Sequence, residues 1–478
     1  MDLHINLSAG KNLSAEIYRQ VRHAIADGRL RPGDCLPASR DLARSLRVSR
    51  TTVTVAYDRL VGEGFLISRV GAGTYVSDHF KPAVNKTRES TKDALSARHI
   101  WESVSVNKPF ERKAKFDFRS GLPDVSMFPH DAWRRLINRE MRLEIKTRGI
   151  YEYAAGVMSL REAIARHIGV SRGVQTSAED VTITNGAQQA LDVIGRCLIE
   201  SGDVVAVEDP GYTPPIQLFK SLGARVKGVQ VDEQGIVVDA LPRDTRLVYV
   251  TPSHQYPLGV TMSLPRRLAL LEWAAQHNVA IIEDDYDSEF RFEERPLEPL
   301  LTLDNSGRVI YVGSFSKTLL PTLRLGFLVT PSSLTLAVHK VKYVSDWHTP
   351  TVPQAALARF IDDGGFARHI RKVGRVYAER RELIKDILNR DFARLLTVAP
   401  SIAGLHISAL TELTSEEIAA TVERGFAQGV AVQQLARFAV EHPPRVGLMF
   451  GYGAIQTDQI REGLKRLGAC LPDSASLC

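Results

Sequence analysis

The segment from Val309 to Gly326 constrains the fold most, because a lysine and an arginine follow directly on an apolar strand. Residues 309–312 read as a buried parallel strand, and the glycine- and serine-rich residues 313–316 read as a turn. Lys317 therefore emerges where the strand ends, and Arg324 follows seven residues later. Because ligands bind outside the carboxyl ends of strands in α/β sheets, this segment predicts an α/β fold with a binding site at Lys317.

The residue types around Lys317 indicate which ligand this site takes. A desolvated lysine near other cations has a lowered pKa and forms a Schiff base with a carbonyl compound, although a lysine without such surroundings is usually a surface residue. Ser314, Ser316 and Arg324 are suited to binding a phosphate group. Pyridoxal phosphate, an aldehyde that carries its own phosphate, meets both requirements.

Two other strand ends support this interpretation. The apolar residues 280–282 run into a cluster of acids, in which Asp284 or Asp285 could pair with the pyridinium nitrogen of the cofactor and Tyr286 could hydrogen-bond its ring oxygen. In the other segment a strand, a turn at Gly186 and a helix follow one another. The N-terminus of that helix offers backbone N–H groups and a positive dipole to a phosphate.

From about residue 116 to the end, the chain resembles the fold-type I, aspartate aminotransferase-like pyridoxal-phosphate proteins. The resemblance rests on seven motifs in the same order: Phe118-Arg-Ser-Gly-Leu-Pro-Asp124, Tyr151-Glu-Tyr-Ala-Ala-Gly156 with Leu160-Arg-Glu-Ala163, Asn185-Gly-Ala-Gln188, Asp209-Pro-Gly-Tyr212, His254-Gln-Tyr-Pro-Leu-Gly259, Asp284-Asp-Tyr286 and Ser314-Phe-Ser-Lys317. It implies an α/β architecture with a large and a small domain around the cofactor.

The length and composition set the frame for this assignment. With 478 residues, of which 44% are hydrophobic, the chain is long enough for two or three domains. It shows neither an apolar secretory segment nor a run of about eighteen uncharged apolar residues, so we expect a soluble, cytoplasmic protein with no membrane partner. Its four cysteines have no metal-ligand spacing, which predicts reduced structural thiols and no metal site.

The basic charge of the chain is confined to its N-terminal quarter. Residues 1–115 contain 20 Lys and Arg against 12 Asp and Glu, whereas the remaining residues contain 41 against 43. A basic segment of this size indicates contact with nucleic acid or another polyanion, and a disordered tail would give the same balance.

The pattern of residues in this quarter favours a folded DNA-binding module. Apolar residues recur at helical spacing between Leu13 and Ile25. A second helix, with Ser39 as its candidate N-cap, and a third that begins at Arg50 are joined by a short turn, which is typical of a helix-turn-helix. Residues 65–77 read as a two-stranded hairpin with a glycine tip, so the module is predicted to be winged.

The same residues closely resemble the GntR-type winged helix-turn-helix. The motifs are Leu36-Pro-Ala-Ser-Arg40, Val48-Ser-Arg50-Thr-Thr-Val53, Tyr57-Asp-Arg-Leu-Val-Gly-Glu-Gly64 and Gly71-Ala-Gly-Thr-Tyr-Val76. The residues that this resemblance places against DNA are Arg40, Arg50, Thr51 and Thr52, with the wing tip of Gly71 and Gly73 near the minor groove. A small protein-binding module is the alternative interpretation.

The chain as a whole resembles the MocR/GabR type of transcriptional regulator. We expect a winged helix in residues 1–79, a flexible basic linker in residues 80–115, where Trp101 or Phe110 could dock on a domain surface, and an aminotransferase-like domain in residues 116–478. The resemblance implies a head-to-tail homodimer bound to double-stranded operator DNA. Two tethered winged helices also gain affinity through their effective concentration.

The fold-type I resemblance assigns a role to each matching residue. It implies that Lys317 forms the covalent bond to the cofactor, that Asp284, rather than the adjacent Asp285, binds the pyridine nitrogen, and that Tyr286 binds the ring oxygen. Tyr212 would stack on the ring, and Tyr151, or less favourably Tyr153, would reach the phosphate of the neighbouring subunit. The residues implied to surround the phosphate are Gly186, Ala187, Ser314, Ser316 and Arg324.

The chain also departs from the aminotransferase pattern. Tyr256 stands where these enzymes usually have Asn, and Pro214 stands where regulators that respond to γ-aminobutyrate carry an arginine. The arginine that clamps a substrate carboxylate has no clean counterpart, because Met449 aligns there. Arg445 and Arg437 are the tentative effector-binding residues. These departures argue against γ-aminobutyrate as the effector and against efficient transamination of simple or dicarboxylic amino acids.

Two classes of function remain. The first is a DNA-binding regulator whose aminotransferase-like domain senses an amino compound or pyridoxal phosphate itself. The second is an active class I/II aminotransferase with an autoregulatory DNA-binding domain. The missing carboxylate clamp and the complete winged helix favour the regulator, with at most vestigial transamination.

Overall fold

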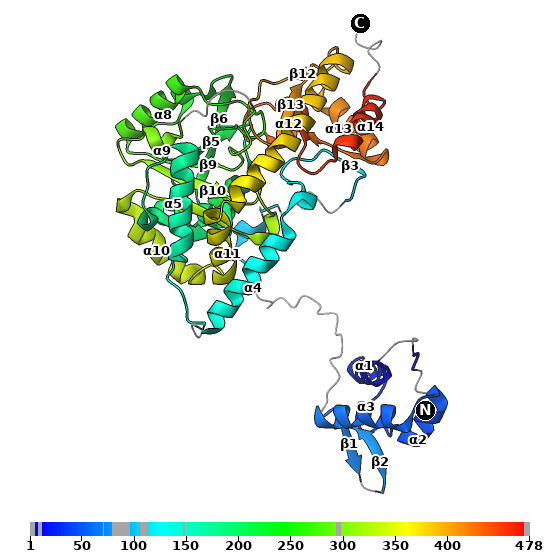
Figure 1. Cartoon of the computed structure of the whole chain (residues 1–478). Helices are drawn as coiled ribbons and strands as arrows, with labels where there is room; N and C mark the ends of the chain where they lie inside the picture. The colour runs from blue at the N-terminus through cyan, green and yellow to red at the C-terminus, as the bar shows by residue number, and fades with distance from the viewer. Residues whose placement is uncertain are drawn as a thin grey trace. The chain divides into compact units, whose positions relative to one another are not determined.

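The computed structural model of the chain divides into two compact units, which are described here separately (Figure 1). The first unit spans Met1–Arg98 and the second spans His99–Cys478. The residues that the structure describes are 5–7, 12–69, 71–78, 96–102, 104–105, 112–146, 149–292 and 298–472. Among them, no helix has the length and apolar character that crossing a membrane requires.

The first unit is a three-helix module with a hairpin. Its elements are α1 (Leu13–Ala26), α2 (Ser39–Leu46), α3 (Arg50–Gly62), β1 (Leu66–Arg69) and β2 (Gly73–Val76). Apolar side chains of all five elements, among them Val21, Leu42 and Val53, pack into one core. The predicted winged helix-turn-helix is therefore present.

Local signals set the ends of these helices. The Ser49 hydroxyl accepts a hydrogen bond from the Thr52 N–H and so caps α3. The prediction that Ser39 caps α2 is wrong, because the helical hydrogen bonds already begin at the Ala38 carbonyl and Ser39 is the first helical residue. The Ser39 hydroxyl is instead reached by Arg50 Nε at 3.5 Å.

The core of the second unit is an eight-stranded mixed sheet within the described residues, in the order β4-β11-β10-β9-β8-β5-β6-β7. Strands β11 and β7 run antiparallel to their neighbours, and the adjacent strands from β10 to β6 run parallel. The bounds are β4 (Val181–Thr184), β5 (Val204–Asp209), β6 (Arg225–Asp232), β7 (Gly235–Ile236), β8 (Thr245–Val250), β9 (Ala280–Asp285), β10 (Val309–Ser314) and β11 (Gly326–Val329). The strands predicted before Gly186, Asp284 and Lys317 are thus confirmed.

Helices cover both faces of this sheet (Figure 1). Those packed on one face are α6 (Ala187–Leu198), α7 (Thr213–Ser221) and α10 (Ser332–Asp346). Those packed on the other are α5 (Met158–Arg172), α8 (Leu264–His277), α9 (Leu300–Leu303) and α11 (Thr351–Asp362), with α4 (His130–Lys146) against α11. Because both faces are covered, the central strands are continuous apolar runs, and every residue of β10 is buried.

A second lobe of the same unit contains a four-stranded antiparallel sheet in the described residues, in the order β12-β13-β16-β15. The long helix α12 (Gly365–Asp391) runs between the two lobes (Figure 1). The other elements of this lobe are β12 (Thr397–Val398), β13 (His406–Leu410), α13 (Ser415–Ala427), β15 (Gln433–Gln434), β16 (Gly447–Gly451) and α14 (Thr457–Gly468), with β3 (Phe116–Asp117) paired to β14 (Val430–Ala431).

Parts of the predicted linker have a defined structure. Residues His99–Glu102 form a short 3-10 helix, in which Trp101 is half exposed. Arg112 lies 3.4 Å from Glu423 and over the ring of Phe426, so the end of the segment contacts α13. Residues 80–95 and 106–111, including Phe110, lie outside the described residues.

Candidate functional site

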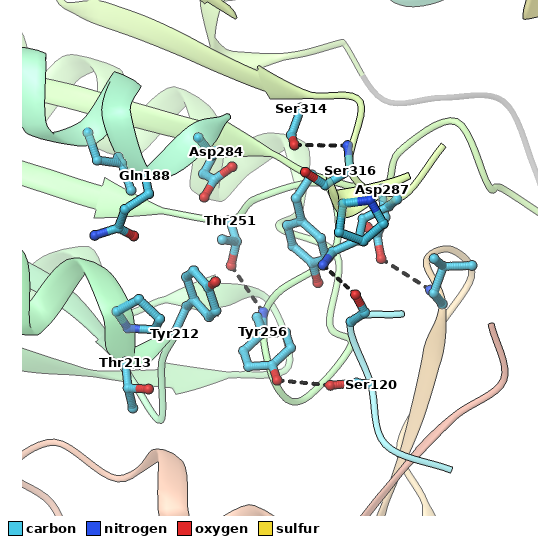
Figure 2. A pocket seen from close by; sticks show the side chains of 18 of the residues that line it. Ser120, Gln188, Tyr212, Thr213, Thr251, Tyr256, Asp284, Asp287, Ser314 and Ser316 are labelled. Carbon is cyan, nitrogen blue, oxygen red and sulfur yellow. Dashed lines mark hydrogen bonds between the residues drawn. The ribbon is translucent and has the colours of Figure 1, made fainter. Parts of the chain in front are cut away.

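The second unit has a cavity of about 350 Å³ at the carboxyl ends of the central strands (Figure 2). Its walls come from both lobes. The first lobe contributes Ala187, Gln188, Leu191, Tyr212, Thr213, Pro214, Tyr249, Thr251, Tyr256, Asp284, Tyr286, Asp287, Ser314, Ser316, Lys317, Pro321 and Arg324. The remaining lining residues are Ser120, Gly121, Leu405, Gln433 and Arg437.

One end of this cavity has the features of an anion site. Gly186 adopts a φ of +77° and serves as the N-cap of α6, so the free N–H groups of that helix face the cavity beside Ala187 and Gln188. Arg324 donates from Nη2 to the Asn185 carbonyl at 2.6 Å, and the Ser316 N–H donates to Ser314 Oγ at 3.2 Å.

Gly186 and Arg324 are packed closely together. A Cβ atom at position 186 would lie 3.0 Å from Arg324 Nη2. The positive φ favours glycine here, and a side chain at this position would also press on the Arg324 guanidinium. This end of the cavity, called the cradle below, therefore combines the Arg324 guanidinium, the hydroxyls of Ser314 and Ser316 and the N-terminus of α6, and it lies in the same cavity as Lys317.

Lys317 extends into the cavity three residues after β10 ends. Its Nζ donates to the Gly121 carbonyl at 2.7 Å. Burial lowers the pKa of Lys317, while the carboxylates of Asp287 and Asp284 act in the opposite direction. A lowered pKa favours the neutral amine, which is the form that attacks a carbonyl carbon.

Strand alternation separates the two adjacent acids of β9. Asp284 lines the cavity and accepts a hydrogen bond from the Tyr249 hydroxyl at 2.6 Å. Asp285 points to the other face of the sheet, where Arg172 Nε lies 3.0 Å from its carboxylate and the Tyr311 hydroxyl donates to it at 2.6 Å. Only Asp284 is therefore placed to meet a ligand in the cavity.

Asp284 also has an unused hydrogen-bonding atom. Its side chain is 3% exposed, and Oδ1 is buried without a partner among the described residues. Burial raises the pKa of Asp284 to about 7, although the bond from Tyr249 acts to lower it. A cationic N–H group in the cavity would satisfy Oδ1 and stabilise the carboxylate.

Three tyrosines form the aromatic wall of the cavity. Tyr212 and Tyr256 meet edge to face with ring centroids 5.3 Å apart, and Tyr256 and Tyr286 do so at 6.1 Å. The Tyr286 hydroxyl donates to the His254 carbonyl at 2.9 Å, and the Tyr256 hydroxyl lies 3.0 Å from Ser120 Oγ (Figure 2).

The residues predicted to contact DNA lie at the starts of α2 and α3 and at the tip of the hairpin. Arg40, Arg50 and Thr51 are exposed at the starts of α2 and α3. Thr52 is half-buried, and its hydroxyl lies 2.8 Å from Ser49 Oγ within the cap of α3. Gly71 and Gly73 are exposed at the tip between β1 and β2, both with positive φ.

Comparison with known proteins shows that a DNA-binding module and an aminotransferase-like domain of these kinds occur together in one family. Residues 13–76 match the model for bacterial regulatory proteins of the gntR family, and residues 114–466 match the model for aminotransferase class I and II. The probable rhizopine catabolism regulatory protein MocR of Rhizobium meliloti is 36% identical over 97% of this chain and 95% of its own length. The chain belongs to the MocR-type transcriptional regulators.

Two further similarities bear on the two units of this MocR-type regulator. The pyridoxine biosynthesis regulator PdxR of Corynebacterium glutamicum is 30% identical, with 96% of each chain covered. The crystal structure of LysN, an α-aminoadipate aminotransferase of Thermus thermophilus, superposes with a TM-score of 0.69 at 29% identity. That match covers 76% of this chain and 93% of LysN, so the second unit has the fold-type I aminotransferase fold.

The cavity of this MocR-type protein fits pyridoxal phosphate. The unpartnered Asp284 Oδ1 suits a pyridinium N–H, the amine of Lys317 suits an aldehyde, and the cradle at Gly186 suits a phosphate. The three groups occur in one cavity, in which Tyr212 supplies an aromatic face.

Some predicted residues lie away from the cavity. Tyr151 is 75% exposed and packs edge to face on Trp347, whereas the Tyr153 hydroxyl lies 3.1 Å from His339 Nδ1. Of the two tentative effector residues, Arg437 lines the cavity mouth, and Arg445 is exposed elsewhere.

Sequence reasoning missed a buried cluster behind the cavity wall. His254 Nδ1 lies 3.1 Å from the Asp287 carboxylate, and the His406 ring is tilted against the His254 ring at 4.4 Å. Their ligand atoms lie within 4.8 Å of one another, close enough to hold a metal ion. Existing hydrogen bonds involve all three side chains: His406 Nε2 lies 3.0 Å from the Pro257 carbonyl, and Asp287 accepts from the Leu405 N–H. The cluster therefore joins the two lobes, and the motif spacings gave no signal for it.

Proposed function

We propose that this MocR-type regulator uses pyridoxal phosphate at Lys317 to sense a small amine and thereby changes its binding to operator DNA. The observation that carries the proposal is the combination in one cavity of a buried lysine amine, an unpartnered carboxylate oxygen of Asp284 and an anion cradle. A winged helix-turn-helix in the same chain supplies the output.

Each side chain has a defined part in this proposal. Lys317 supplies the amine that binds the aldehyde carbon, and Asp284 holds a proton on the pyridine nitrogen. Ser314, Ser316 and Arg324, with the N-terminus of α6, anchor the phosphate. Tyr212 covers the ring face. The cofactor, when bound, supplies an electrophilic carbon that primary amines attack and an electron-accepting ring.

The cavity position suggests how binding is transmitted. Both lobes contribute lining residues, so a bound amine would contact Tyr256 from one lobe and Gln433 from the other. An effector shifts the equilibrium between two arrangements only by its difference in affinity for them. Loading of the cofactor itself is a second form of the signal, which the name of the PdxR relative supports.

We further propose that the protein acts as a head-to-tail homodimer. Exposed aromatic side chains pack on one another around Tyr151: Tyr151 lies edge to face on Trp347, and Trp347 stacks on Tyr343. The same segments of chain carry the exposed apolar residues Ile145, Ile150 and Val344. A cluster of this kind is typical of a protein-protein interface. In the dimer Tyr151 would reach the phosphate in the cavity of the partner.

A working aminotransferase is the second candidate function. The observation that favours it is that Lys317, Asp284 and the phosphate-cradle residues are all present, although a domain without catalytic activity would not require all of them. Against it, Met449 occupies the centre of the small sheet with 0% exposure, where the carboxylate-binding arginine was expected.

Visible absorbance of the full chain loaded with pyridoxal phosphate tests the proposal. Lys317→Ala is expected to abolish the dialysis-resistant absorbance band of the covalently bound cofactor, whereas Lys220→Ala, at an exposed lysine of the same unit, leaves it unchanged. Keto-acid formation and DNA affinity are followed in the same samples. If amines are turned over catalytically and have no effect on DNA affinity, the protein is an aminotransferase and the proposed amine-sensing regulation is wrong.

A further inference from the structure

The wall of the cavity around Ser120 and Gln433 carries a chain of hydrogen bonds whose direction can be worked out. The Ser120 N–H donates to Gln433 Oε1 at 2.7 Å, which fixes the orientation of the amide. Ser120 Oγ donates to the same oxygen at 3.0 Å. Ser120 has then used its only hydroxyl proton, so the Tyr256 hydroxyl, 3.0 Å away, must donate to Ser120.

This chain leaves two kinds of group for a ligand. Gln433 is 7% exposed and lines the cavity, and the hydrogen bonds of its side chain in the described structure are both made by Oε1, so the two N–H donors of Nε2 are left for a ligand. The Tyr256 hydroxyl already donates its hydrogen bond to Ser120, so only an acceptor lone pair of its oxygen remains for a ligand. The cavity wall therefore presents N–H donors of Gln433 and an acceptor oxygen of Tyr256, two uncharged groups that are linked through Ser120.

A carboxylate matches this wall poorly. It has acceptors only, so it would pair with the Gln433 amide and leave the Tyr256 oxygen facing a like partner. An alcohol hydroxyl both donates and accepts, and it satisfies Tyr256 and Gln433 together. Because a polar group left unpaired in a buried site is costly, the wall favours the hydroxyl.

The charges of the cavity point the same way. The acidic lining residues in the described structure are Asp284 and Asp287, and the basic ones are Lys317, Arg324 and Arg437. Lys317 and Arg324 are committed to the aldehyde and the phosphate under the proposed function. Arg437 is left for an effector carboxylate, and its exposed guanidinium attracts a carboxylate only weakly through water.

We propose that the effector is a hydroxyl-bearing primary amine without a carboxylate, an amino alcohol or amino polyol whose hydroxyl group binds between Gln433 and Tyr256. This inference rests on the proposed function, because the amine must meet the cofactor at Lys317. Ser120 hydrogen-bonds both Gln433 and Tyr256, so it holds these two side chains in position and links the two lobes across the cavity wall.

The test compares compounds that differ only in CH₂OH against carboxylate. The full chain loaded with pyridoxal phosphate is titrated with serinol and serine, with 4-aminobutan-1-ol and 4-aminobutanoate, and with glucosamine as a polyol. Absorbance and affinity for DNA from upstream of its gene are both recorded. We expect the hydroxylated member of each pair to shift the absorbance at a concentration at least tenfold lower and to change DNA affinity.

Two variants sharpen the result. Tyr256→Phe removes the acceptor and is expected to weaken the response to the amino alcohols about tenfold while leaving the response to amino acids unchanged. Arg437→Gln is expected to change the amino-alcohol response less than twofold. An equal or stronger response to the amino acids, no response to any hydroxylated amine, or a large loss in Arg437→Gln would overturn the inference.

The proposed function is checked independently with methoxyamine, which reacts with the bound aldehyde whatever the shape of the wall. If methoxyamine changes the spectrum and the amino alcohols do not, the effector class is wrong and the cofactor assignment stands. If the protein shows no cofactor band at all, both fail together.

Discussion

The two units of the chain differ in the burial of their ion pairs, since the second unit has exposed pairs such as Arg166–Asp362 and also buries others. In the first, the ion pairs lie at the surface: Arg29 and Asp27 are 60% and 35% exposed, and Arg59 pairs with Glu63 at 2.9 Å in a similar setting. In the second, Arg172 and Asp285 form a pair at 3.0 Å with 5% and 1% exposure, and Arg380 and Asp124 are equally buried at 2.7 Å.

This difference matches what each unit has to bind. An exposed arginine can meet the phosphates of an external polyanion without losing its water until contact. A buried pair cannot bind an external ligand, but it holds the strand ends in place around a small cavity. The same residue types therefore serve recognition in the first unit and positioning in the second.

Breaking the Arg172–Asp285 pair should give the largest effect on stability. Arg172→Leu leaves Asp285 buried with only the Tyr311 hydroxyl, and we expect a loss of about 3–5 kcal/mol in the free energy of unfolding of the second unit. Urea titration of the full chain measures it. The double variant Arg172→Leu with Asp285→Leu should recover most of the loss, and a loss below about 1 kcal/mol in the single variant would contradict the role given to this pair.

A second buried acid should make stability depend on pH. Burial raises the pKa of Glu208 to about 7, from an ordinary value of 4.5. The unfolded chain therefore loses the Glu208 proton before the folded chain does, and this residue lowers stability progressively as the pH rises from about 4.5 to 7. Glu208→Gln removes the penalty and should stabilise by about 1–3 kcal/mol at pH 8 and by little at pH 5. Thermal unfolding at both pH values checks the prediction, which fails if the gain is the same at both.

The exposed arginine at the start of α3 should affect DNA binding and leave stability unchanged. Arg50→Ala is expected to lower affinity for DNA from upstream of the gene about tenfold and to reduce the slope of log affinity against log salt by about one. The matched control is Arg19→Ala on α1, an exposed arginine away from the N-terminus of α3. Fluorescence anisotropy at several salt concentrations gives both numbers, and equal effects of the two variants would remove Arg50 from the DNA interface.

The smallest effect is expected at the surface pair of Arg29 and Asp27. Arg29→Ala removes an ion pair that water already screens, so the free energy of unfolding should stay nearly unchanged. The change should shrink further in high salt. A loss of unfolding free energy comparable to that of Arg172→Leu would contradict the difference in stability that we expect between exposed and buried ion pairs.

Local patterns were enough to predict the strands, the winged helix and the position of Lys317 at a strand end. Apolar periodicity and turn residues are encoded within about ten residues, and Val309–Ser314 shows this directly. The placement of Asp284 over Asp285 also follows from strand alternation, once β9 is known to be covered on both faces.

The rest of the cavity could not be predicted, because it depends on the second lobe folding back on the sheet. Gln433 and His406 belong to short strands that follow Lys317 by 116 and 89 residues, and neither is part of a motif. The failure at Ser39 has a local cause, since both Ala38 and Ser39 are compatible with a helix start and the backbone hydrogen bonds decide between them.

The adjacent acids of β9 make this strand intolerant of changes in length. Because Asp284 and Asp285 point to opposite faces, inserting or deleting one residue within β9 would exchange them, burying the ligand-facing carboxylate against Arg172 and turning its neighbour into the cavity. Substitutions elsewhere in the strand can be absorbed by repacking, whereas an indel of a single residue would disable the cavity and the sheet at once. Domain grafts and shuffled libraries built on this scaffold should therefore place their junctions outside Ala280–Asp285.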